Sequence, residues 1–150
     1  MNRIITAAEA EQTIADVATL IEKLSGLMEQ ETALVHAGQV KRASGLGATK
    51  TDLAGQLYVT AERLKANAKF LSQAAPGRCA ALAHLQEAFR IVLQKNMIVL
   101  ATAHAVSEGI VRRLSGDLAR KTSPQVYGAS GRTTAPNPRY GQPLALSRRL

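Results

Sequence analysis

Apolar residues recur at alternating steps of three and four along the first part of the chain, between Thr6 and Val35. Such steps place side chains on one face of an α-helix. The pattern therefore predicts one long amphipathic helix over residues 6–35. Its apolar row consists of Ile14, Val17, Ile21, Leu24, Met28 and Val35, widened by Leu20, Leu27 and Leu34.

Turn signals separate this helix from a second one. Gly38 and the small residues within 43–47 predict a turn, and Thr49 or Thr51 is expected to cap the helix that follows. The second helix is expected to end at the Pro76-Gly77 pair. One of its faces carries leucines, namely Leu53, Leu57, Leu64 and Leu71.

A third pattern starts at Arg78 and continues to Arg120. An unbroken helix of that length would span roughly 65 Å. Its steps of three and four run through Leu82, Leu85, Phe89, Val92, Asn96, Val99, Ala103, Val106, Ile110 and Leu114. Three long helices joined by short turns must run up and down and cover each other's apolar rows. We therefore expect an all-α fold, an elongated antiparallel three-helix bundle or coiled coil over residues 1–120.

The periodicity stops near Lys121. Residues 121–150 contain four prolines, three glycines, five basic residues and no acidic residue. A segment of this composition buries too little apolar surface to offset the entropy of ordering it. We expect a flexible basic tail over 121–150.

Composition narrows the class further. The chain has 26 alanines and 18 leucines but only five aromatic residues and no tryptophan, which argues against sandwiches, barrels and doubly wound α/β folds. Its one cysteine cannot form a disulfide within the chain. The opening residues lack an apolar run of signal-peptide length, and the longest apolar stretch, 97–106, is too short for a membrane span. We expect a soluble cytoplasmic protein.

The charge is unevenly distributed. The formal net charge is +8, yet residues 1–38 carry −4 and residues 121–150 carry +5. A basic tail can bind polyanions without sequence preference. Because the chain shows no helix-turn-helix, zinc-finger or RNA-reading aromatic motif, a nucleic-acid-associated helical protein is an alternative and not the main interpretation.

Candidate catalytic and metal-binding patterns are weak. His36, His84 and His104 lie too far apart for a helical metal pair. Residues 45–51 resemble a phosphate-binding loop, but no glycine directly precedes Lys50 and no strand comes before the segment, so we interpret it as a turn between helices. Cys79 is interpreted as a packed cysteine. We expect no enzyme activity, no metal site and no cofactor.

Asn96 interrupts the apolar row of the third helix. A buried asparagine at such a position sets helix register or partner choice at some cost in stability. The other interpretation, which we slightly prefer here, places Asn96 at the solvated edge of the row. Val92 and Val99 keep the same phase on either side of it.

The end of the third helix is the best candidate binding surface. The third helix carries apolar residues to its end, whereas the apolar row of the first helix ends at Val35 and the second helix is shorter than its neighbours. Part of the apolar face of the third helix is therefore expected to stay uncovered and to form an open groove. Such a groove could take an amphipathic helix of a partner, with ordinary bundle core as the alternative. The candidate residues are Val99, Val106, Ile110, Val111, Leu114 and Leu118.

Several segments match the pattern of a known family in their order. Residues 27–34 (Leu-Met-Glu-Gln-Glu-Thr-Ala-Leu) are followed by Lys50 and then by Leu53 and Leu57. The third helix carries Leu85, Leu93, Asn96 and Leu100, and the tail carries Val-Tyr-Gly-Ala-Ser-Gly over 126–131. Over residues 14–131 the chain resembles the FlgN-type flagellar type III export chaperones.

The resemblance implies a cytoplasmic chaperone that binds the C-terminal helical segment of hook-associated junction proteins and prevents their premature assembly. It also implies delivery to the cytoplasmic domain of the export gate protein FlhA, with Tyr127 and Gly128 as the docking element. The second pair, Tyr140-Gly141, is another candidate for docking. A purely structural coiled-coil assembly factor is a further alternative, and homodimerisation stays open.

Overall fold

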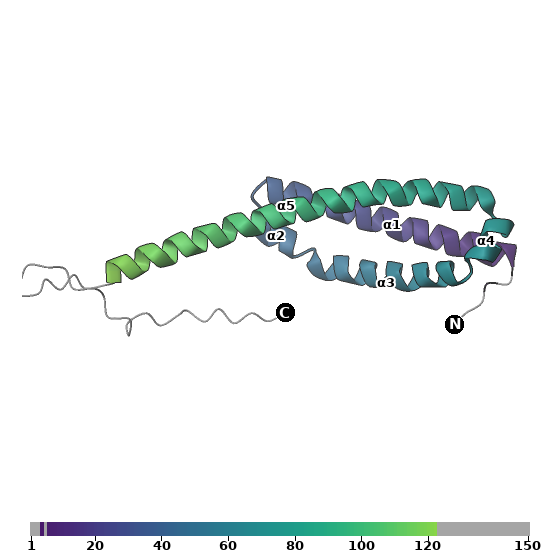
Figure 1. The fold of residues 1–150 in the computed structure, drawn as a ribbon, viewed down its shortest axis with the longest axis horizontal. Helices are drawn as coiled ribbons and strands as arrows, with labels where there is room; N and C mark the ends of the chain where they lie inside the picture. The colour runs from purple at the N-terminus through teal and green to yellow at the C-terminus, as the bar shows by residue number, and fades with distance from the viewer. Residues whose placement is uncertain (1–3, 5, 123–150) are drawn as a thin grey trace, which may run out of the picture. The chain divides into compact units, whose positions relative to one another are not determined.

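The computed structural model describes residue 4 and residues 6–122. This part of the chain forms five helices, which are labelled in Figure 1: α1 (Ala7–His36), α2 (Val40–Ser44), α3 (Gly47–Ala66), α4 (Ala68–Ala74) and α5 (Pro76–Thr122). The expectation of an all-α protein is confirmed for these residues, none of which belongs to a strand. No helix among them is both long and apolar enough to cross a membrane.

The chain divides into two compact units, residues 1–103 and residues 104–150. The first contains α1 to α4 and the first part of α5, and the second contains the rest of α5. The structure shows Lys121 and Thr122 as the last residues of α5. The other residues of the predicted tail, Tyr127, Gly128 and Tyr140 included, lie outside the described part.

Helix α1 has defined signals at both ends. Thr6 Oγ1 accepts a hydrogen bond from Glu9 N, and the Glu9 carboxylate accepts one from Thr6 N, each at 3.2 Å, which forms a capping box. At the other end Gly38 has a φ of +72°, a left-handed conformation that suits glycine. The N–H groups of Gly38 and Gln39 donate to the carbonyls of Val35 and Leu34. This pattern is a Schellman motif, which ends the helix close to where the sequence predicted.

The middle of the chain differs from the prediction. Residues 40–44 already form the short helix α2, so α3 begins at Gly47 with Leu46 as its N-cap residue, and neither Thr49 nor Thr51 caps it. Thr51 lies inside α3, where its hydroxyl donates to the Gly47 carbonyl at 3.0 Å. The expected cap is wrong because the turn is itself helical and continues into α3.

The predicted second helix is also interrupted at Asn67. The Asn67 side chain donates to the Arg63 carbonyl at 2.8 Å and accepts a hydrogen bond from Ile4 N at 3.1 Å. Both hydrogen bonds join the side chain to backbone groups at the point where α3 ends and α4 begins. Asparagine commonly makes such bonds at helix ends. The chain then enters α5 at Pro76, a favoured residue for the first helical turn.

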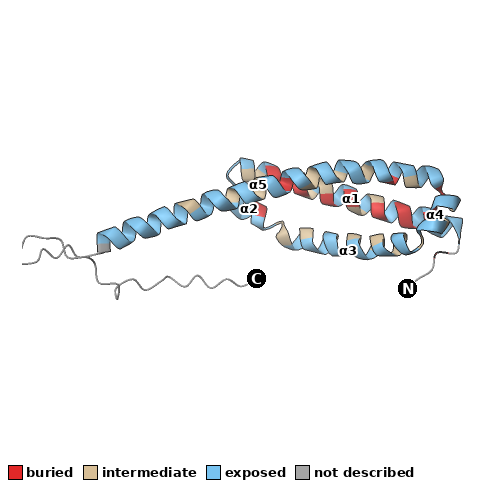
Figure 2. Ribbon diagram, in the orientation of Figure 1, coloured by how far each residue is buried: buried red, intermediate tan, exposed pale blue. Residues whose placement is uncertain are grey.

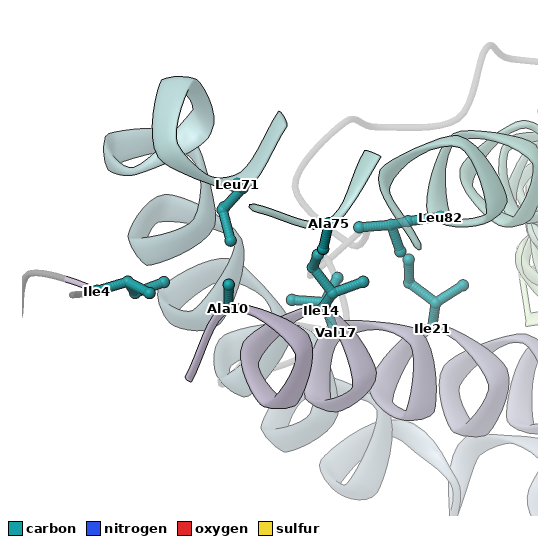
Figure 3. Packing of buried hydrophobic residues seen from close by; sticks show 8 residues of the cluster. All are labelled: Ile4, Ala10, Ile14, Val17, Ile21, Leu71, Ala75 and Leu82. Atoms are coloured by element: carbon teal, nitrogen blue, oxygen red, sulfur yellow. The ribbon is translucent and has the colours of Figure 1, made fainter. Parts of the chain in front are cut away.

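The core of the first unit is arranged around α1. Figure 3 shows residues of α1 facing α4 and the start of α5, with Leu71 near Ala10 and with Ala75 and Leu82 near Ile14 and Ile21. Figure 2 shows buried residues concentrated along α1, whereas α3 has no fully buried residue. The predicted row of α1 is confirmed as buried from Ile14 to Met28, which positions its polar neighbours Glu31 and Thr32 beside the core.

Candidate functional site

A buried polar cluster joins three helices of the first unit. Asn96 of α5 is only 2% exposed, and its Nδ2 lies 2.9 Å from Glu31 Oε2, 3.1 Å from the Met28 carbonyl oxygen and 3.2 Å from Thr32 Oγ1, all on α1. The interpretation of Asn96 as a solvated edge residue is therefore wrong. The spacing of three and four residues along α5 continues through Asn96 because the asparagine side chain itself faces α1.

Lys50 of α3 completes this cluster. Its Nζ lies 2.7 and 2.9 Å from the two carboxylate oxygens of Glu31, whose side chain is 6% exposed. Both Glu31 oxygens are thus hydrogen-bonded, one to Lys50 and the other to Lys50 and Asn96. A buried carboxylate is tolerated when a cation and further donors compensate its lost hydration. Glu31, Lys50 and Asn96 form what we call the polar cluster, and it fixes one alignment of α1, α3 and α5.

The predicted binding residues fall into two groups. Val99 belongs to the first unit, where it is half-buried. The other five belong to the second unit, where they are 49–58% exposed. We call these five the apolar row; they are Val106, Ile110, Val111, Leu114 and Leu118. The structure therefore places the row on the surface of α5.

Charged residues accompany the apolar row on the same helix. The Glu108 carboxylate lies 3.7 Å from His104 Nδ1 and 3.5 Å from Arg112, both one turn away. These contacts are exposed, and pairs of this kind contribute a few tenths of a kcal/mol to a helix. The second unit thus presents an exposed apolar face bordered by charges.

A groove that sequence reasoning missed lies between α1 and α3. Its volume is about 630 Å³, and its lining is mixed: Asp16, Thr19, Leu20, Gly55, Gln56, Val59 and Thr60. Of these lining residues, Leu20 alone belongs to the predicted apolar row of the first helix. The small residue Gly55 on α3 is the one signal that could have indicated it.

A smaller hollow of about 310 Å³ lies between α1 and the start of α5. Alanines at 15, 18 and 81 line it together with Ile14, Glu22, Arg78, Leu82 and Leu85. The neighbouring Cys79 is half-buried, and its Sγ lies 3.5 Å from the Leu71 carbonyl oxygen, as a packed cysteine would. Among the described residues, no three His, Cys, Asp or Glu side chains are grouped so that they could hold a metal ion.

Comparison of the chain with models of protein families, with curated proteins and with solved structures found no match. The polar cluster and the apolar row are the features of the described residues that bear on function.

Proposed function

We propose that this protein is a cytoplasmic flagellar export chaperone of the FlgN type, with a body folded as an elongated antiparallel three-helix bundle. In this role it binds the C-terminal helical segment of hook-associated junction proteins and delivers it to the FlhA gate. The observation that carries the proposal is the exposed apolar row of α5. The proposal assigns no catalytic residue, metal or cofactor.

The apolar row has the character of a helix-docking surface. Large apolar side chains at 106, 110 and 114 follow one another at steps of four, so they face the same side of α5 over two turns. An amphipathic helix laid along this face would remove them from water. Burying the exposed half of a valine, isoleucine or leucine side chain contributes about 1 kcal/mol. Three such side chains provide a substantial part of the affinity of a transient complex.

The polar cluster supports the same proposal from the first unit. Glu31, Lys50 and Asn96 are among the residues on which the resemblance depends, and they meet in one cluster although they lie far apart in the sequence. Each comes from a different helix. A role in holding α1, α3 and α5 in register gives a physical reason for these residue types at these positions.

The docking part of the proposal concerns residues outside the described part of the chain. A tyrosine offers a large contact area with a polar tip, which is the character of an interface anchor. We propose Tyr127 and Gly128 as the element that contacts the gate, with Tyr140 as the alternative. Tyr127→Ala is expected to weaken binding to the FlhA cytoplasmic domain and to leave substrate binding unchanged, measured by calorimetry. Equal gate affinities of the variant and the wild type would contradict this assignment.

The substrate part is tested by co-expression of the full chain with C-terminal segments of junction proteins. The double variant Ile110→Asp/Leu114→Asp is expected to lose capture, because each aspartate would have to be desolvated against the substrate helix. Its matched control is Ile91→Asp/Ile98→Asp, which changes equally exposed isoleucines of α5 in the first unit. Capture that survives the first double variant, with circular dichroism showing a folded protein, would contradict the assignment.

The net charge of +8 favours one other function, that of a nucleic-acid-associated protein. Phosphate-dominated binding falls steeply as salt rises, whereas binding through an apolar row changes much less. A salt titration with duplex DNA and with a junction segment separates the two. A structural coiled-coil assembly factor predicts stable homo-oligomers in place of a hetero-complex, which sedimentation would show.

A further inference from the structure

Two arginines lie along one edge of the apolar row. Arg113 follows Val106 by seven residues, and Arg120 follows by seven more. Seven residues make almost two helical turns and leave an offset of roughly 20°. Val106, Arg113 and Arg120 therefore lie along nearly one line on α5, with the two arginines about 10 Å apart along the axis. We call Arg113 and Arg120 the basic edge.

The basic edge has no acidic partner among the residues that the structure describes. Glu108 lies against His104 and Arg112, at 3.7 and 3.5 Å, and not against either arginine of this edge. Asp117 lies between the two arginines along the helix, but no ion pair within 4 Å joins it to either of them in the described part. Residues 104–122 contain four basic and two acidic side chains, so this segment has a net charge of +2 with His104 neutral.

From this arrangement we infer that the partner of the apolar row is an amphipathic helix with acidic residues beside its apolar face, spaced seven apart. The inference rests on the proposed function, since it specifies the substrate class of the same surface. Two carboxylates at that spacing on a parallel or antiparallel helix would lie opposite Arg113 and Arg120. Charges at the edge of a helix–helix contact select partners and their orientation in this way.

The size of the row argues against a second copy as its occupant. Its five half-exposed side chains offer far less than the roughly 800 Å² per partner that a stable dimer buries. Two copies paired antiparallel would also bring equally charged arginine edges together, which is unfavourable. A hetero-partner of opposite charge avoids this repulsion.

The test uses the full chain and three designed helical peptides of about 20 residues. All share one apolar leucine and alanine face, and two positions seven apart at its edge carry Glu, Gln or Lys. Binding is measured by fluorescence anisotropy of the labelled peptide. Two exposed ion pairs correspond to roughly fivefold in affinity, so the Glu peptide is expected to bind about fivefold tighter than the Gln peptide and the Lys peptide more weakly still. The preference should shrink as salt rises from about 0.05 M to about 0.5 M.

Charge reversal locates the preference on the protein. Arg113→Glu/Arg120→Glu is expected to invert the order, so that the Lys peptide binds tighter than the Glu peptide. The matched control, Arg90→Glu/Arg112→Glu, changes the net charge by the same amount at exposed arginines away from this edge. The control is expected to keep the original order, and circular dichroism checks that both variants fold.

Several results would overturn the inference. It fails if the three peptides bind with equal affinity, if the control variant loses the preference as well, or if poly-glutamate without an apolar face binds as tightly as the Glu peptide. It also fails if the wild-type chain sediments as a dimer that Ile110→Asp/Leu114→Asp converts to a monomer, because a second copy would then occupy the row.

These outcomes are separable from those of the proposed function. Binding of the Gln peptide with no gain for the Glu peptide overturns the charge inference and leaves junction-protein capture standing. Conversely, a clear preference for the Glu peptide without capture of any junction segment supports the acidic partner helix and contradicts the flagellar assignment.

Discussion

Asn96 shows how one amide can specify a helix packing. Its NH₂ group has two hydrogens and three acceptors on α1 within 3.2 Å, so at least one hydrogen is shared between acceptors. An apolar residue at this position would leave Glu31 with the Lys50 cation alone. A shift of α5 by one turn would separate Asn96 from these acceptors, and the polar cluster therefore disfavours alternative registers.

Replacement of Asn96 tests this role. Asn96→Asp removes both donors and brings a second carboxyl group to the buried Glu31 oxygens. We expect the free energy of unfolding to fall by about 2–4 kcal/mol, measured by urea denaturation. The control Gln94→Asp makes the same kind of change at an exposed position of α5 and should cost less than about 0.5 kcal/mol. Equal midpoints for the two variants would refute a structural role of the Asn96 amide.

The Glu31–Lys50 pair makes a second prediction at this scale. Lys50→Met leaves the buried carboxylate without its cation and should lower the free energy of unfolding by about 2–3 kcal/mol, slightly below the range for fully buried pairs because the Lys50 side chain is 24% exposed. The double variant Lys50→Met/Glu31→Gln should recover at least about 1 kcal/mol of the free energy of unfolding that Lys50→Met loses, because a neutral amide needs no cation.

The exposed pair of Lys65 and Glu62, 3.8 Å apart, provides the comparison. Lys65→Met should change the free energy of unfolding by no more than about 0.5 kcal/mol. If Lys50→Met costs as little as Lys65→Met, or if the double variant is no more stable than Lys50→Met alone, the compensation argument for the polar cluster is incorrect.

At the scale of the helices, hydrophobic spacing identified the long elements because burial on one face needs a period near 3.6. Helices α1 and α5 begin and end within about two residues of the prediction, where a threonine cap, a glycine and a proline mark their ends. The segment between them was less predictable. A helix as short as α2 contains too few residues to show a hydrophobic period. At the break between α3 and α4, the Asn67 side chain accepts a hydrogen bond from the backbone of Ile4, which is distant in the sequence.

Two threonines distinguish a true cap from an apparent one. Thr6→Ala removes the capping box of α1 and should lower the free energy of unfolding by about 1 kcal/mol. Thr51→Ala should be neutral or slightly stabilising, because alanine is the better helix former inside α3 and the lost hydroxyl bond is local. Thermal denaturation of both variants measures this. A larger loss for Thr51→Ala than for Thr6→Ala would contradict the observed start of α3.

At the scale of the whole molecule, the two units differ in how their helices are stabilised. In the first, α1 packs against α3, α4 and the start of α5. In the second, α5 exposes nearly all its residues between 104 and 121. A short helix without buried contacts is only marginally stable in water.

Amide hydrogen exchange should therefore separate the units. Backbone amides of residues 106–119 are expected to exchange at least about a hundredfold faster than those of residues 14–28, because opening this part of α5 breaks no core contact. Addition of the acidic helical peptide should slow exchange at 106–119 and leave 14–28 unchanged. Equal protection of the two segments in the free protein would show that 104–122 is held by contacts beyond its own helix.

The sequence by itself determined the helical class, the ends of the long helices and the buried row of α1, because these depend on local periodicity and end signals. It also identified the apolar residues of the row on α5 and the Glu31, Lys50 and Asn96 positions of the resemblance. Only the tertiary structure decided that these last three residues meet, that Asn96 is buried and that Val99 is separated from the exposed row. Those properties depend on which faces of distant helices come together, and the spacing within one helix carries no information about its neighbour.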